Sequence, residues 1–166
     1  MIDWYKKVVF ENYANFNGRA RRSEYWWFTL AHIIIVAVLT LLDSSLGLTF
    51  GGGESGILKT IYSFLIFIPS LAVAVRRLHD VGKSGWLLLI TYGLIIACAI
   101  AMVLSGIATG MAGGNFGLAF IIPVLGIIAV GIYMLILFCK EGDHGANKYG
   151  ADPKLSGEEI NEIGVE

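Results

Sequence analysis

The residues best suited to binding chemistry stand at positions 76–80, which read Arg-Arg-Leu-His-Asp. If one helix carries all five, Arg76 lies four residues and Arg77 three residues before Asp80, so both guanidinium groups reach its carboxylate. Arginines held at headgroup depth match a phosphate in a bidentate manner, which predicts a site for a lipid phosphate. The same pattern also fits a topology signal with an ion pair that fastens the loop. The spacing leaves both interpretations open.

A second basic cluster, Arg19, Arg21 and Arg22, precedes the first long apolar segment. We expect it on the same face of the membrane as Arg76 and Arg77. Together these residues form a basic collar that attracts anionic lipid.

Two histidine–carboxylate pairs, His79-Asp80 and Asp143-His144, are residue types that bind transition metals or exchange protons. Their spacing carries no metal signature, so we predict neither a metal nor a cofactor. No nucleophile-elbow pattern frames the neighbouring serines, and no catalytic residue is predicted. A membrane enzyme that acts on a lipid through His79 and Asp80 is the least supported class of function.

His32 lies about seven residues into the first apolar segment, roughly 10 Å along a helix. An imidazole at this depth faces protein or water, and we favour a hydrogen bond to another helix over a proton relay. No acidic partner lies in mid-membrane, since Asp43 is at the far end of the segment. The alternative function is a small oligomeric transporter or channel whose path is lined by His32, Thr40, Ser63 and Tyr92.

The composition shows which elements position these residues. Of the 166 residues, 56% are hydrophobic and 15% charged, the mean hydropathy is +0.71, and positions 84–139 hold no Asp, Glu, Lys or Arg. About twenty apolar residues cross a membrane as a helix. We predict an all-α, polytopic membrane bundle of four transmembrane helices, after a short interfacial helix within 2–13. The expected spans are about 25–42, 57–75, 86–104 and 118–138, which gives a membrane domain at 1–140 and a polar cytoplasmic tail at 141–166.

Local signals predict where these helices begin and end. Ser23 is a plausible N-cap of the first span, Asp43 is expected to end that span, and the arginines after Val75 are expected to end the second. The glycine-rich stretch 51–53 is expected to be a connection, and the region 105–115 is expected to contain the return loop.

The basic residues also predict the orientation. All twelve Lys and Arg residues except Lys59 fall on one side of a four-span layout. The positive-inside rule then places both termini in the cytoplasm.

Three motifs together resemble the YhaH/YhaI-like bacterial inner-membrane proteins, and they cover nearly the whole chain. They read Asn15-Phe16-x-Gly18-Arg19-x-x-Arg22-x-Glu24-Tyr25-Trp26, then Arg76-Arg77-Leu78-His79-Asp80 with Ser84-Gly85-Trp86, then Gly142-x-x-Gly145-x-Asn147-x-Tyr149-Gly150-x-Asp152-Pro153. Tyr149 stands where Phe is equally expected. The resemblance implies a bacterial inner-membrane protein and no reaction, because that family is labelled a domain of unknown function.

The motif residues all fall on the predicted cytoplasmic face, where we expect one polar assembly. They are Arg19, Arg22, Glu24, Arg76, Arg77, His79, Asp80 and Asn147. The leading hypothesis is a non-enzymatic membrane protein that uses this assembly to bind anionic lipid headgroups or a partner protein and to stabilise a homo-oligomer. No nucleic-acid partner is predicted. The ligand, the oligomeric state, the helix packing order and the pathway do not follow from the sequence.

Overall fold

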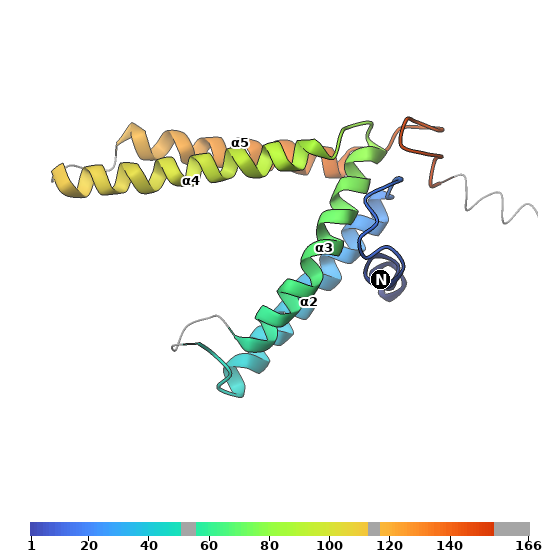
Figure 1. The fold of residues 1–166 in the computed structure, drawn as a ribbon, viewed down its shortest axis with the longest axis horizontal. Coiled ribbons are helices and arrows are strands. Elements are labelled where there is room, and N and C mark those ends of the chain that lie inside the picture. The colour runs from blue at the N-terminus through green and yellow to red at the C-terminus, as the bar shows by residue number, and fades with distance from the viewer. Residues whose placement is uncertain (51–55, 113–116, 155–166) are drawn as a thin grey trace, which may run out of the picture. The chain divides into compact units, whose positions relative to one another are not determined.

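The computed structural model describes residues 1–50, 56–112 and 117–154 (Figure 1). Its regular structure there is helical, apart from two isolated β-bridges. The elements in chain order are α1 (Ile2–Lys6), the π-helical turn η1 (Lys7–Glu11), α2 (Arg22–Ser45), α3 (Ile57–Asp80), α4 (Trp86–Ala112) and α5 (Leu118–Cys139). Among the described residues, four helices are long and apolar enough to cross a membrane, which confirms the predicted fold class.

The chain packs as two compact units. The first joins Met1–Gly82 with the segment that begins at Glu141, and the second is Lys83–Lys140. The start of the polar tail therefore packs with the first 82 residues.

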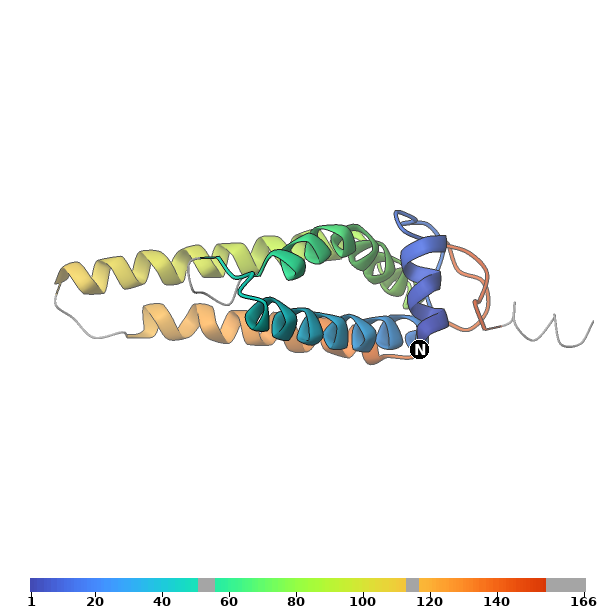
Figure 2. The same cartoon turned by 90° about the horizontal axis from the view of Figure 1, so that it is seen from below.

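In the first unit, α2 and α3 form a hairpin, and α1 with η1 lies across it near one end (Figure 2). The core at this crossing contains Val8 of η1, Phe28 of α2 and Val73 of α3, all buried. Tyr5 of α1 stacks on Phe28 with ring centroids 5.8 Å apart. The short N-terminal helix is thus held against both long helices by apolar and aromatic contacts.

The other end of this hairpin is fastened by Asp43, which sequence analysis placed only as the end of the first span. Its carboxylate is buried and accepts hydrogen bonds from the backbone N–H groups of Leu58 and Lys59, each 3.0 Å long. A Cβ at Gly56 would overlap this carboxylate. Asp43 therefore caps the start of α3 from the neighbouring helix.

In the second unit, α4 and α5 pack side by side, with Leu88, Met134 and Leu137 among the buried residues. α4 continues to Ala112, past the residue at which the third span was expected to end. Within this last part of α4, the Thr109 hydroxyl donates a 2.9 Å hydrogen bond to the Ser105 carbonyl of the same helix. The rest of the region expected to contain the return loop, and the glycine stretch at 51–53, lie outside the described residues.

The start of α2 differs from the prediction, and the end of α3 lies beyond the expected span. α2 begins at Arg22 with Arg21 at the N-cap, so Ser23 is not the cap. α3 continues past Val75 to Asp80. One helix therefore carries all five residues at positions 76–80, which is the condition set out above for their ion pairing.

Candidate functional site

Asp80, the last residue of α3, is the centre of the first of two buried ion-pair clusters. Arg19 donates from Nε to its Oδ1 at 3.0 Å, and Arg77 donates from Nη1 to its Oδ2. Arg77 has no exposed surface at all. The two guanidinium groups offset part of the cost of burying this carboxylate.

Glu24, in the first turn of α2, is the centre of the second cluster. Arg76 donates from Nη1 to its Oε1 at 2.7 Å, and the Lys7 ammonium lies 3.5 Å from its Oε2. The prediction that Arg76 pairs with Asp80 is therefore wrong. The neighbouring helix offers Arg76 a carboxylate of its own, while Arg77 and Arg19 already hold both oxygens of Asp80.

The start of the tail folds back onto the Asp80 cluster. Arg19 donates from Nη1 to the Gly145 carbonyl at 2.5 Å and from Nη2 to the Asp143 carbonyl. All three nitrogens of Arg19 therefore have acceptors. A Cβ at Gly142 would overlap the Asp80 carboxylate, so only glycine lets the chain pass this close.

His79 and Asn147 fasten the same tail segment from the side. His79 donates from Nδ1 to the Gly18 carbonyl at 3.1 Å, and its ring stacks on Tyr149 at a centroid distance of 3.8 Å. Asn147 donates from its side-chain amide to the His79 carbonyl at 3.0 Å. The Tyr149 contact uses the face of the ring, which phenylalanine also provides.

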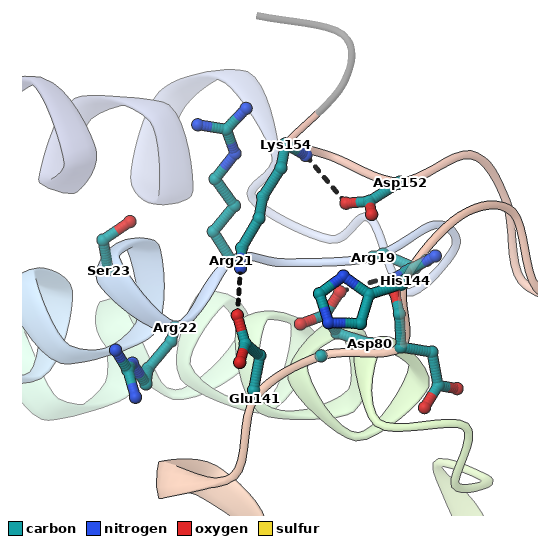
Figure 3. Close-up of a pocket in the computed structure, with 11 residues that line it drawn as sticks. Arg19, Arg21, Arg22, Ser23, Asp80, Glu141, His144, Asp152 and Lys154 are labelled. Carbon is teal, nitrogen blue, oxygen red and sulfur yellow. Dashed lines mark hydrogen bonds and ion pairs between the residues drawn. The ribbon is translucent and has the colours of Figure 1, made fainter.

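A pocket of about 510 Å³ opens between the start of α2 and the tail (Figure 3). Its lining residues are Arg19, Arg21, Arg22, Ser23, Asp80, Glu141, Gly142, Asp143, His144, Asp152 and Lys154. All of them belong to the first unit. The pocket therefore lies at the end of the α2/α3 hairpin where the two ion-pair clusters meet the polar tail.

The pocket brings partly exposed basic groups to an uncapped helix start. No side chain caps α2, and Ser23 lines the pocket instead. Arg21 donates from Nε to the Pro153 carbonyl at 2.5 Å, and its Nη2 donates to the same oxygen. Arg22 and Lys154 are exposed. The positive end of a helix dipole favours anions at such a position.

The acidic residues of the pocket are engaged within it. Lys154 donates to Glu141 at 2.5 Å, and this ammonium lowers the pKa of Glu141. Asp152 accepts hydrogen bonds from the backbone of Lys154 at 2.9 Å and of Gly145 at 3.0 Å, and these bonds, the first above all, lower its pKa. Both carboxylates stay ionised at neutral pH, and each is hydrogen-bonded to the tail residues named above.

The structure sorts the predicted site residues into three groups. Arg19, Arg22 and Asp80 line the pocket. Glu24, Arg76 and Arg77 are buried and line no part of it. His79 and Asn147 hold the tail, and their binding role stays a prediction.

His32 lies apart from this site, within the α2/α3 hairpin. Its Nδ1 shares a 3.1 Å hydrogen bond with the Tyr62 hydroxyl, which lies 3.3 Å from the hydroxyl of Tyr5. Its ring also stacks with Phe28 and Tyr62. The expected hydrogen bond from His32 to another helix is present. Through the Tyr62 hydroxyl it is linked to Tyr5 of α1.

Sequence reasoning left Ser23, Asp152 and Lys154 out of the predicted site. The only signal for Asp152 was its place in the tail motif, which does not show where the tail docks, and Lys154 follows that motif. Within the described chain, no three His, Cys, Asp or Glu side chains gather as metal ligands.

Four membrane-crossing helices with one polar assembly at a hairpin end define a multi-pass helical membrane protein. Residues 13–151 match the family described as "Protein of unknown function (DUF805)", and the chain belongs to it. The chain is 40% identical over 154 residues to inner membrane protein YhaH of Escherichia coli (strain K12), covering 93% of this chain and 98% of that protein. It is 36% identical over 155 residues to YhaI of the same strain, with the same coverage.

No solved structure matches the chain. The relatives and the four apolar helices place this protein in the inner membrane, as an integral protein that crosses it several times. They carry no activity with them.

Proposed function

We propose that the pocket at the start of α2 binds the phosphate of an anionic lipid headgroup on the cytoplasmic side of the inner membrane. The observation that carries this proposal is the meeting of Arg21, Arg22 and Lys154 with an uncapped helix start in one pocket. A phosphate adds to an arginine hydrogen bond the attraction of a negative charge and the paired oxygens of a bidentate contact, which a single neutral carbonyl lacks. A phosphate oxygen therefore competes well with the Pro153 carbonyl for the Nε–Nη2 edge of Arg21.

The basic residues support the cytoplasmic orientation. α2 begins and α3 ends beside the pocket, and every Lys and Arg except Lys59 belongs to a segment on that side of the four-span layout. Both termini then lie in the cytoplasm.

The position of the pocket favours a lipid over a partner protein. It adjoins the first turns of α2, where Tyr25, Trp26 and Trp27 follow one another. Such aromatic side chains favour the headgroup level. The buried Arg76 and Arg77 then act as a frame that holds α2 and α3 together, while the partly exposed cations meet the ligand. A homo-oligomer stays a prediction.

The test is native mass spectrometry of the protein released from its own membrane, which counts the lipids that remain bound. Arg21→Gln/Arg22→Gln should lose a retained anionic lipid that the unaltered protein keeps. The matched control Lys6→Gln/Lys148→Gln removes the same charge from exposed residues that do not line the pocket. Equal loss in both variants would reduce the effect to general charge, and no loss in either would refute the proposal.

No specific observation favours the two alternative functions. The hydroxyls of Thr40 and Ser63 donate to carbonyls of their own helices, at 2.8 Å each, rather than pointing to a shared path. For an enzyme, the His79 Nδ1 is committed to Gly18 and the Asp80 carboxylate to two arginines.

A further inference from the structure

Arg76 has one edge of its guanidinium group without a partner. The residue is 3% exposed, and its Nη1 donates to Glu24. Its Nε and Nη2 are also buried, and neither has a hydrogen-bond partner among the described residues. Buried polar groups are nearly always hydrogen-bonded, and a charged group is the most costly exception.

The two atoms are a functional pair. In a guanidinium group the N–H bonds of Nε and Nη2 point the same way, and this edge binds both oxygens of a carboxylate or a phosphate. Arg21 uses the same edge for the Pro153 carbonyl in this protein.

The local charge also calls for an anion. Glu24, itself 2% exposed, is the carboxylate that meets both Arg76 and Lys7. One negative charge therefore faces two positive charges. A water molecule on the Nε–Nη2 edge would satisfy the N–H groups and leave the excess positive charge in place, whereas an anion would offset both.

We propose that the Nε–Nη2 edge of Arg76 is an anion-binding position that takes two oxygens of one phosphate or carboxylate group. It shares no residue with the pocket at the start of α2, so it does not depend on the proposed headgroup site. A free anion and a lipid headgroup offer the same oxygens to this edge.

Lys7 is the member of the Glu24 cluster that reaches the solvent. Of the three side chains in the Glu24 cluster, only Lys7 is substantially exposed, at 43%. Lys7 is also the first residue of η1, and π-helical turns often occur at functional sites. Because the Nε and Nη2 atoms of Arg76 are buried, an anion reaches them only when a neighbouring side chain moves, and Lys7 is the exposed, flexible member of this cluster.

The test measures the melting temperature of the full chain, purified in a phosphate-free sugar detergent. Inorganic phosphate or a short-chain phosphatidic acid is added at constant ionic strength, with chloride as the reference. At a hundredfold excess over Kd, a specific anion should raise the melting temperature by roughly 5–10 °C. Arg76→Lys keeps the positive charge and a bond to Glu24 but lacks the Nε–Nη2 edge of a guanidinium group. The anion should therefore not raise the melting temperature of this variant. Arg21→Gln/Arg22→Gln should keep the rise.

Each outcome decides the proposal. A rise with inorganic phosphate supports a free anion, and a rise with the short-chain lipid alone supports a headgroup. No rise with either, or the same rise in Arg76→Lys, would overturn the proposal and leave an internal water at the edge. If Arg76→Lys does not fold, Glu24→Gln carries the test: it removes the competing charge and should tighten phosphate binding about tenfold. An unchanged or weaker affinity in that variant overturns the proposal as well.

Discussion

The backbone N–H of Asp143 donates a 2.8 Å hydrogen bond to the carbonyl of Asp80. The whole second unit, Lys83–Lys140, lies between these two residues in the chain. The polar tail thus returns to the residue where the α2/α3 hairpin ends. The tail is a structural part of that hairpin, and this gives predictions that do not depend on any ligand.

Replacing Arg19 should free the tail. Arg19→Gln leaves Asp80 with one guanidinium partner and removes the donors to the Asp143 and Gly145 carbonyls. Breaking a buried ion pair on one side costs about 3–5 kcal/mol. Hydrogen exchange of residues 141–154 should become faster in this variant. Arg22→Gln, at an exposed neighbouring position, is the control, and unchanged exchange in Arg19→Gln would contradict the docking described above.

Replacing Asp43 should destabilise the opposite end of the hairpin. Asp43→Ala removes the acceptor for the N–H groups of Leu58 and Lys59, and losing a helix cap costs about 0.5–2 kcal/mol. Thermal unfolding in detergent measures the loss. Ser44→Ala, at an exposed site next in sequence, should have little effect. Equal stability of the two variants would show that the cap contributes nothing.

The ring of Tyr149 should matter more than its hydroxyl. Tyr149→Phe keeps the stacking on His79, while Tyr149→Ala loses it. Aromatic stacking contributes about 0.5–1.5 kcal/mol beyond the buried area. Protease cleavage of the tail should be faster in Tyr149→Ala only. Faster cleavage in Tyr149→Phe would mean that the hydroxyl, rather than the stacking, holds the tail.

Acid should loosen the tail through Asp152. Its backbone hydrogen bonds lower its pKa below the ordinary 3.8, so its contribution is complete above pH 3.8 and is lost as the pH falls through the lower, folded value. The amide NMR signal of Gly145, which donates to this carboxylate, should report the transition. Asp152→Asn should abolish it. A transition that persists in Asp152→Asn would belong to another group.

The helices were predictable because apolar length alone determines what crosses a membrane. Residues 84–139 show this most clearly, since an uncharged stretch of that length predicts two spans without any tertiary information. The pairings were not predictable in the same way. Spacing along one helix predicted both Arg76 and Arg77 on Asp80, but Arg76 bonds to Glu24 of the neighbouring helix. Which helices are neighbours is a tertiary fact.

The sequence predicted which residue types form the candidate site. It did not predict the pocket that these residues line. The motifs named the arginines and Asp80, and the structure brings them to one end of the hairpin. The pocket itself depends on how residues 141–154 fold back, and backbone carbonyls such as that of Pro153 carry no signal in the sequence. The capping role of Asp43 was not predicted for the same reason. Its partners are the backbone N–H groups of Leu58 and Lys59, which carry no signal in the sequence.

The bonds from Arg19 to the Asp143 and Gly145 carbonyls also impose an order on biosynthesis. Arg19 leaves the ribosome long before its tail acceptors are made, and chains are synthesised at about 5–20 residues per second. For that interval, two of its three nitrogens have only water or lipid headgroups to bond. The nascent chain therefore reaches the membrane with this cation still available to anionic lipid. The hydrogen bonds from Arg19 to the tail form only after all four spans have been made.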